Sequence, residues 1–386
     1  MNIISKLSSS DTTIFTEMSA LAAKHGALNL GQGFPDFDPP KVLLDLVQKH
    51  VSNHKHQYAP MAGVVQLREI IAQKTAIAYR CHVHPDSEIT ITAGATQAIF
   101  TAITAIVHPG DEVIIFEPAY DSYRPSIELA GGKVKVYTME APEFKIQWEI
   151  VSAMITEKTK MIIINTPHNP TATIMTREDM NKLSFIVKDT NIVILSDEVY
   201  EHLVYDNRSH ESVLKYPELF LRSIAVFSFG KTYHCTGWKI GYCIAPEYLM
   251  KEFRKVHQWN VFCVNSFLQN ALAEYMEDPS HYLGLNDFYQ KKRDFFLNTI
   301  QKSGLKTLDT KGTFFQLCDY SEMSDMDDDA FAKVLTIKHG VACIPVSGFY
   351  SDKRQSKLVR FCFAKEEEVL YQAGLKLNAL DKYSFQ

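Results

Sequence analysis

Short runs of β-branched and other apolar residues alternate with helical patterns through the middle of the chain. Strands are predicted at 88–92, 112–116, 133–139, 161–165, 192–196, 223–229 and 240–245. Helices are predicted between them, for example at 94–107 and at 176–190, where Thr176 is expected to cap the helix. Nearly continuous apolar strands separated by helices indicate a sheet that is buried on both faces. The pattern therefore predicts an α/β fold in which helices flank a mostly parallel central sheet.

The pattern changes near residue 285. A long charged helix at 288–302 precedes three short strands, at 313–318, 341–346 and 357–364, with helices between and after them. This pattern of helices and short strands is typical of a separate, smaller α+β domain. The first 40 residues are rich in Gly and Pro around GQGFPDFDPP (31–40), which predicts an extended arm rather than a domain.

Composition narrows the class of protein. The chain has 386 residues, 40 of them Lys or Arg and 45 of them Asp or Glu, so its net charge is −5. An acidic balance argues against nucleic acid or an anionic membrane as the main partner. Seven scattered cysteines without a Cys-x-x-Cys pair predict neither a metal site nor disulfides. No apolar run is long enough to cross a bilayer, and residues 1–15 lack a secretory signal, so we expect a cytoplasmic protein.

Polar residues follow three of the predicted strands. Asn169 lies in the TPHNPT segment after 161–165, Asp197 and Tyr200 follow 192–196, and Lys231 follows 223–229. Open α/β sheets bind ligands beyond the carboxyl ends of their strands, so these side chains are expected to converge. After 88–92, the small residues AGAT (93–96) open a helix whose free N–H groups can hold a phosphate.

Each of these residues also has an ordinary structural interpretation. A carboxylate after a strand, such as Asp197, is commonly a helix cap or a surface group. A lysine after a glycine, such as Lys231, is commonly solvated, and small residues at a helix start commonly cap it. We expect His168, between two prolines, to support the structure rather than to act as a base.

Together these residue types favour one cofactor, pyridoxal 5'-phosphate. Lys231 would supply the amine for its aldehyde and, once released, a general base for the substrate α-proton. Asp197 would keep the pyridine nitrogen protonated, and Tyr200 and Asn169 can donate to the phenolate oxygen. Around the phosphate, the helix start would be joined by Ser228 and Lys239.

SFGKTYHCTGWKIGY (228–242) resembles the active-site lysine signature of class I aminotransferases, which are fold-type I pyridoxal-phosphate enzymes. NTPHNPT (165–171) and SDEVYEHLVY (196–205) resemble that family's other two cofactor motifs, in the same order. The chain is most similar to the branch that holds bacterial methionine aminotransferase, kynurenine aminotransferase and glutamine transaminase K, and within it to the first of these. This likeness is carried by TTIFTEMSALA (12–22), NLGQGFPDF (29–37), QYAPMAG (57–63) and FEPAYDSY (116–123).

The resemblance implies three parts and a role for each matched residue. An N-terminal arm at 1–40 would pack on the active site and the small domain, 41–284 would bind the cofactor, and 285–386 would form the small domain. Lys231 matches the Schiff-base lysine, Asp197 the partner of the pyridine nitrogen, and Tyr200, with Asn169, the phenolate contacts. The implied phosphate contacts are Ala95, Thr96, Ser228, Lys239 and, reaching across a homodimer interface from the neighbouring subunit, Tyr58.

On the substrate side, Tyr120 matches the aromatic residue that stacks on the cofactor ring. Arg360 matches the arginine that binds the substrate α-carboxylate, with Asn169 beside it and Gly33 in the loop that faces it. Arg360 lies in an apolar strand, where a buried guanidinium needs an anion or several carbonyls as partners. Tyr58 could equally be an interface packing residue, as Phe15 could be a core residue of the arm.

Two departures from the wider class shape the expected activity. Lys239 stands where many members have Arg, and a lysine gives a point charge instead of a planar fork. No arginine that selects acidic side chains can be identified, whereas Phe15, Tyr58 and Tyr120 offer aromatic walls. We therefore expect ping-pong transamination between an apolar, sulfur-containing or aromatic L-amino acid, with methionine favoured, and a 2-oxo acid.

Two alternatives stay open at this point. The same residues could support a carbon–sulfur β-lyase that acts on cysteine conjugates. A catalytically silent binding or regulatory protein is a second possibility, which intact Lys231, Asp197 and Arg360 argue against.

Overall fold

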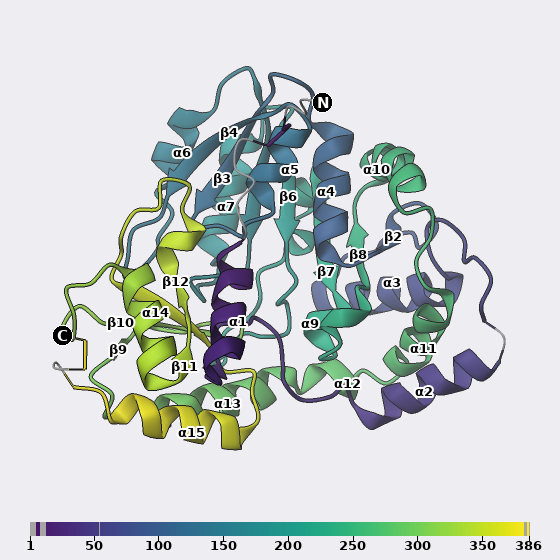
Figure 1. Cartoon of the computed structure of the whole chain (residues 1–386). Coiled ribbons are helices and arrows are strands. Elements are labelled where there is room, and N and C mark those ends of the chain that lie inside the picture. The colour runs from purple at the N-terminus through teal and green to yellow at the C-terminus, as the bar shows by residue number, and fades with distance from the viewer. Residues whose placement is uncertain (1–4, 8–12, 54, 382–383, 386) are drawn as a thin grey trace, which may run out of the picture.

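The computed structural model describes residues 5–7, 13–53, 55–381 and 384–385. A seven-stranded sheet forms its centre (Figure 1), in the order β2-β8-β7-β6-β5-β3-β4. These strands are β2 (Ile89–Thr92), β3 (Glu112–Glu117), β4 (Lys133–Thr138), β5 (Thr159–Asn165), β6 (Val193–Asp197), β7 (Ser223–Ser228) and β8 (Gly241–Ile244). Only β8 runs antiparallel to its neighbours, so the predicted mostly parallel sheet is confirmed.

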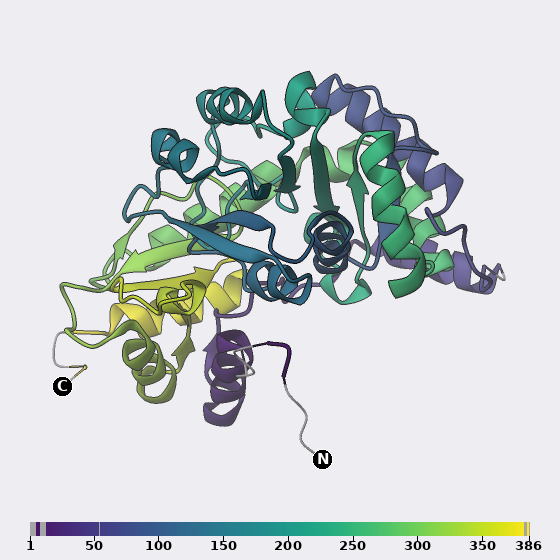
Figure 2. The same cartoon turned by 90° about the horizontal axis from the view of Figure 1, so that it is seen from above.

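Helices cover both faces of this sheet (Figure 2). One face packs against α4 (Ala95–Ile106), α5 (Tyr123–Leu129) and α10 (Glu247–Asn260). The other packs against α2 (Lys41–Ser52), α3 (Val65–Tyr79), α6 (Trp148–Met154), α7 (Arg177–Val187), α8 (Pro217–Phe220) and α11 (Ser266–Met276). Successive residues of β5 serve the two cores in turn: Met161 and Ile163 on one face, Ile162 and Ile164 on the other. Burial on both faces explains why the strands read as unbroken apolar runs.

A second, antiparallel sheet follows in the chain. Its order is β12-β13-β10-β9, formed by β9 (Lys306–Thr307), β10 (Phe315–Asp319), β12 (Ile344–Pro345) and β13 (Leu358–Cys362). With α13 (Leu285–Thr299), α14 (Asp328–His339) and α15 (Glu367–Asn378) it encloses a core of its own. The smaller α+β unit is thus present, whereas its exact boundary at residue 285, like that of the arm at residue 40, stays a prediction.

The arm differs from the expected extended segment. Ile14–His25 forms helix α1, capped by the Thr13 side chain at its start and by Gly26, with φ of 60°, at its end. Met18 of this helix joins the core of the second sheet. β1 (Leu28–Asn29) then pairs in parallel with β11 (Val341–Ala342). The prediction of an extended arm was wrong for residues 14–25. The glycines and prolines that suggested it lie at 31–40, whereas 14–25 is flanked by its own helix-capping residues, Thr13 and Gly26.

Other local predictions are confirmed. Thr176 caps α7 and forms a reciprocal capping box with Asp179. No helix of the described residues is long and apolar enough to span a membrane. Residues 1–15, in which no secretory signal is expected, lie mostly outside the described residues. The cytoplasmic location stays a prediction.

A buried ion pair fastens α3 to the loop after β6. Lys74 and Glu201 bond to each other, with side chains only 5% and 3% exposed, and Tyr242 OH lies 2.9 Å from Lys74 Nζ. Burial by itself raises the pKa of Glu201, but the Lys74 ammonium, His202 and the Tyr79 hydroxyl together outweigh it, and the pKa falls to about 2. The carboxylate is therefore ionised in the folded protein and depends on its cation.

Replacing Lys74 by methionine should lower the free energy of unfolding by about 3–5 kcal/mol, because it leaves a buried carboxylate without its partner. Urea denaturation at neutral pH measures this. The control is Lys41→Met, which breaks an ion pair whose side chains are 85% and 58% exposed and should cost at most about 1 kcal/mol. Equal losses in the two variants would contradict the assignment.

Candidate active site

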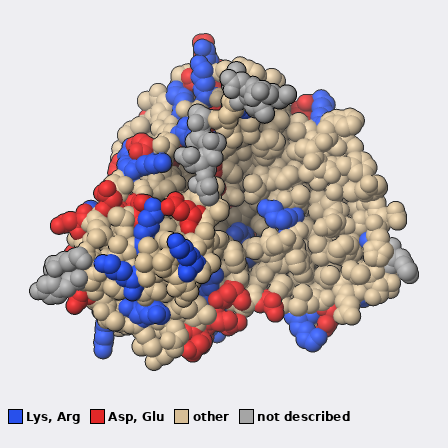
Figure 3. All heavy atoms as spheres, in the orientation of Figure 1, with Lys and Arg blue, Asp and Glu red and all other residues tan. Residues whose placement is uncertain are grey.

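A cavity of about 300 Å³ opens beyond the carboxyl ends of β5, β6 and β7. Figure 3 shows this cavity as a hollow near the middle of the surface in view, with basic side chains inside it. Among the predicted site residues it is lined by Gly33, Ala95, Thr96, Tyr120, Asn169, Asp197, Tyr200, Ser228, Lys231, Lys239 and Arg360. Sequence positions more than 300 residues apart thus meet here, because the arm and the second sheet close over the edge of the first. The roles of these residues toward a ligand stay predictions.

Lys231 lies on the short helix α9 (Phe229–Thr232), directly after β7. Its Nζ donates to the backbone oxygen of Gly33 at 2.9 Å and lies 5.5 Å from the centre of the Tyr200 ring. Burial lowers the pKa of this amine to about 8, and the nearby Arg360 and Lys239 cations act in the same direction. About a tenth of the amine is therefore uncharged at pH 7, far more than for an ordinary lysine, and the uncharged amine is the form that attacks a carbonyl.

Asp197 ends β6 and faces the same cavity. Tyr123 OH donates to its Oδ2 at 2.6 Å, and the backbone N–H of Val199 donates to Oδ1 at 3.4 Å. Burial raises the pKa of Asp197 to about 6 although both hydrogen bonds act to lower it. A nearby cation would stabilise the charged form of this buried carboxylate, and a protonated ring nitrogen is such a cation.

Tyr123 is a site residue that sequence reasoning missed. It lies in the FEPAYDSY segment, three residues after Tyr120, and the two rings meet edge to face with centres 5.6 Å apart. A helical start places residues i and i+3 on one side of the chain, which is the signal that could have identified it.

Asn165 is a second missed residue, and it ties two motifs together. It is the last residue of β5, beside Asp197 in the parallel pairing with β6. Its Nδ2 donates to the Asp197 backbone oxygen at 2.8 Å, and its Oδ1 accepts from the Asn169 backbone N–H at 2.8 Å. His168 is buried and lies 2.8 Å from Thr171 through Nδ1, and burial lowers its pKa to about 3, which agrees with a structural role.

One corner of the cavity is suited to an anion. Helix α4 starts at Ala95 with no side-chain cap, so its first N–H groups are not satisfied by a capping side chain. Gly94 precedes it with φ of 78°, and a Cβ there would lie 3.4 Å from Lys239 Nζ. Thr96 Oγ1 lies 3.2 Å from Tyr120 OH, and Ser228 lines the cavity from the end of β7. A helix start, a lysine and hydroxyl groups are the usual components of a phosphate cradle.

Arg360 is buried in β13, with 1% of its surface exposed. Its Nη1 donates to Asn169 Oδ1 at 2.5 Å and its Nη2 to the Gly31 backbone oxygen at 3.3 Å, while Nε has no partner among the described residues. Its Cζ lies 3.8 Å from the centre of the Phe315 ring and 5.3 Å from that of Phe15. Burial lowers the pKa of Arg360 to about 10, so it stays a cation at neutral pH.

The loop that faces Arg360 requires a glycine. A Cβ on Gly33 would lie only 2.9 Å from Phe315 Cζ, so any side chain there would displace the ring that packs on the guanidinium. The same close approach of the loop places the Gly33 carbonyl oxygen within hydrogen-bonding distance of Lys231 Nζ.

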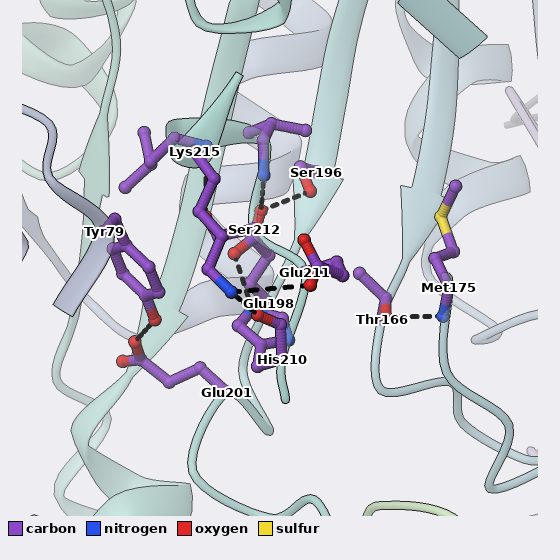
Figure 4. Close-up of polar contacts among 12 residues, drawn as sticks. Tyr79, Thr166, Met175, Ser196, Glu198, Glu201, His210, Glu211, Ser212 and Lys215 are labelled. Atoms are coloured by element: carbon purple, nitrogen blue, oxygen red, sulfur yellow. Dashed lines mark hydrogen bonds and ion pairs between the residues drawn. The ribbon is translucent and has the colours of Figure 1, made fainter. Parts of the chain in front are cut away.

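A polar network supports β6 behind the cavity (Figure 4). Glu198, fully buried, accepts from Ser196 Oγ at 2.7 Å and from the Val213 backbone N–H at 3.1 Å, and lies 2.8 Å from His210 Nε2. In the same view Tyr79 bonds to Glu201. The side chains of the consecutive residues Asp197 and Glu198 point to opposite sides of the strand end. The network around Glu198 therefore holds the backbone that carries Asp197.

Tyr58 does not line the cavity. Its side chain is 81% exposed and contacts Phe262 edge to face, with ring centres 5.1 Å apart. Within one chain, Tyr58 therefore lies away from the other predicted site residues.

The model of the class I and II aminotransferase family matches residues 26–374. The chain belongs to this family. It is 50% identical to the methionine aminotransferase of Escherichia coli over 97% of this chain and 98% of the relative, and 33% identical to a kynurenine–oxoglutarate transaminase of Dictyostelium discoideum over 97% and 95%.

Solved structures agree with the family assignment. YbdL from Escherichia coli, for which a methionine aminotransferase function has been identified, superimposes with a TM-score of 0.97 at 50% identity over 98% of this chain and all of the other. N-succinyldiaminopimelate aminotransferase from Mycobacterium tuberculosis gives 0.93 at 33% identity over 98% and 99%. The aminotransferase fold, family and transamination reaction predicted from the sequence are thereby confirmed, and the β-lyase alternative is not favoured.

The bond between Tyr123 and Asp197 can be tested directly. Tyr123→Phe should raise the pKa of Asp197 by about one to two units, since a hydrogen bond to a charged group contributes about 1.5–3 kcal/mol. Titration of the ¹³C-labelled Asp197 carboxyl by NMR in the cofactor-free aminotransferase measures this. Tyr120→Phe is the matched control, because that hydroxyl bonds to Thr96 instead. An unchanged titration in Tyr123→Phe, or an equal shift in both variants, would show that the bond does not stabilise the carboxylate.

Proposed function

We propose that the cavity binds pyridoxal 5'-phosphate and that the enzyme transfers the amino group of an apolar, sulfur-containing or aromatic L-amino acid, methionine foremost, to a 2-oxo acid. The observation that carries the proposal is the half-buried Lys231 amine, with a pKa lowered to about 8, in one cavity with the Asp197 carboxylate. Enzymes of this family use that cofactor, and the residues present fit it.

The fit rests on three features of this chain. The uncapped start of α4 with Gly94 and Lys239 would hold the phosphate. Asp197, buried and bonded on one side to Tyr123, would face the ring nitrogen, and Lys231 Nζ would hold the aldehyde carbon. When bound, the cofactor supplies that aldehyde and a ring that accepts electrons from the substrate α-carbon.

The protein's own groups bind and orient the substrate. Arg360 would bind the α-carboxylate, because its Nε has no partner and Nη1 and Nη2 are held by Asn169 and Gly31. Since Asn169 Oδ1 accepts from Arg360, its amide nitrogen is left to donate to the ligand. Tyr200 is buried, which raises its pKa well above 10, so it keeps its proton and acts as a donor.

Lys231 is the group placed to move the α-proton. Once its Nζ is free of other bonds, the lowered pKa lets the neutral amine accept a proton near neutral pH.

The wall of the cavity supports the choice of donor. Phe15, Phe34, Ile99 and Phe315 line it together with Tyr120. Sulfur and aromatic groups pack well against such rings. The relative that is 50% identical is a methionine aminotransferase, which places methionine first.

A homodimer would complete the site with Tyr58. Tyr58 contacts the exposed Phe262, and Trp259, with 86% of its surface exposed, lies three residues before Phe262 in the sequence. Few charges lie over α10 and α11 on the face shown in Figure 3. A largely uncharged surface with exposed aromatic side chains is typical of an interface between subunits.

The donor class can be tested with half-reactions followed by the absorbance of the bound cofactor. Methionine, phenylalanine and tyrosine should react with a kcat/KM at least about tenfold above that of aspartate, since the cavity offers aromatic walls rather than a spare cation. Lys231→Ala should abolish turnover, and Lys41→Ala, at an exposed position, should not. Pyruvate release from a cysteine conjugate that exceeds transamination would instead favour the β-lyase.

The lowered pKa of Lys231 predicts a pH dependence for cofactor capture. The neutral amine is the reactive form, so the rate at which cofactor-free protein takes up pyridoxal phosphate should rise with pH, with a midpoint near 8. Borohydride reduction followed by peptide mapping measures the adduct on Lys231, and Lys231→Ala should give none there. A midpoint above about 10, as for an ordinary lysine, would show that burial does not activate the amine.

A further inference from the structure

Gln97 is a polar side chain of α4 that does not line the cavity but bonds to the turn that forms one of its corners. It is the third residue of the helix, and its Oε1 accepts from the Ala93 backbone N–H at 3.1 Å. Ala93 lies between β2 and α4, directly before Gly94, and the next two residues, Ala95 and Thr96, line the cavity. Gln97 therefore holds the turn that carries the proposed phosphate contacts.

The bond to Ala93 resembles one half of a capping box. In the complete motif, a Ser or Thr at the N-cap accepts from the third N–H of the helix, and a Glu or Gln at the third position accepts from the N-cap backbone. At the start of α4 the N-cap is Gly94, which has no side chain, and the Gln97 amide accepts one residue earlier, from Ala93. The turn is thus tied down, while the backbone N–H groups of Ala95, Thr96 and Gln97 donate to no described residue. These donors remain free for an anion.

The other end of the Gln97 amide reaches α10, which packs beside α4 (Figure 1). Its Nε2 lies 2.6 Å from Thr101 Oγ1, 3.2 Å from Asn260 Oδ1 and 3.3 Å from His257 Nδ1. Burial lowers the pKa of His257 to about 4, so the ring is neutral at pH 7 and its Nδ1 can accept. Acceptors surround the amide nitrogen and a donor faces the amide oxygen, which gives the side chain a single favourable orientation.

Backbone packing also restrains the turn. A Cβ on Gly241 would lie 3.2 Å from the Ala95 backbone nitrogen, so the start of β8 lies directly against the turn. Lys239 packs there as well, since a Cβ on Gly94 would lie 3.3 Å from its Cε. The turn is therefore packed against β8 and Lys239, and the Gln97 amide links it to α10.

We propose that Gln97 is a positioning residue that sets the affinity of the enzyme for the phosphate group of its cofactor. It acts through the turn, by holding the free N–H groups of Ala95 and Thr96 in the arrangement that an anion requires. The inference rests on the proposed function, because it needs the phosphate at the start of α4. Loss of the bond to Ala93 should therefore weaken binding of the phosphate and not binding of the pyridine ring.

Pyridoxal 5'-phosphate and pyridoxal are the probes, because they share the aldehyde and the ring and differ in the phosphate. Gln97→Met, which has a similar length but no amide, should raise the Kd of the cofactor-free enzyme for pyridoxal phosphate about tenfold and change that for pyridoxal less than about twofold. Gln97→Glu keeps an oxygen for the Ala93 N–H and should restore most of the affinity. Gln372→Met, which removes an exposed amide of α15, is the matched control and should change neither Kd.

Hydrogen exchange tests the bond without any cofactor. The Ala93 amide of the cofactor-free enzyme should exchange at least about tenfold faster in Gln97→Met than in the wild type. Gln97→Ser serves for both measurements if the methionine variant does not fold. An equal loss of affinity for the two probes, or an unchanged ratio of their Kd values, overturns the role of Gln97. Failure of the wild-type enzyme to bind pyridoxal phosphate instead overturns the proposed function.

Discussion

Two cationic side chains, the buried Arg360 and the half-buried Lys231, face one cavity, and neither has a carboxylate as a direct partner. Lys231 bonds to a backbone carbonyl, and Arg360 bonds to an amide and a second carbonyl. Burial lowers the pKa of both groups, and the Arg360 cation lowers that of Lys231 further. The same constraint makes the amine reactive and leaves the guanidinium in need of an anion, so the chemistry of the site follows from how these two charges are enclosed.

The sheet makes this enclosure possible. Adjacent parallel strands end at one edge, where Asn165 joins the ends of β5 and β6 through two hydrogen bonds. Buried polar groups on the other side, above all Glu198 with Ser196 and His210, hold the same strand end from behind. Asp197 is therefore fixed by contacts on both faces of the sheet, which limits its freedom to turn away from a ligand.

The strands of the mostly parallel sheet and the convergence of Asn169, Asp197 and Lys231 could be predicted from the sequence, because apolar runs and the polar residues that end them are local patterns. Tyr123 and Asn165 could not be assigned so readily. Their roles depend on bonds to Asp197, which is distant in sequence, and nothing in a tyrosine or an asparagine by itself reveals such a partner. Helix α1 was not predicted for a different reason. Its capping residues can be recognised in the sequence, but the neighbouring glycines and prolines suggested an arm without helices.

The carbonyls of Gly31 and Gly33 give the arm a part in ligand exchange. They occupy donors of Arg360 and Lys231 that a substrate and a cofactor would otherwise claim. The pairing of β1 with β11, and the Phe34 carbonyl that accepts from Lys365 Nζ at 2.9 Å, also hold the arm. Under the proposed function, a cofactor on Lys231 replaces the bond to the Gly33 carbonyl, so occupancy of the cavity and the hydrogen bonding of the arm are thermodynamically linked.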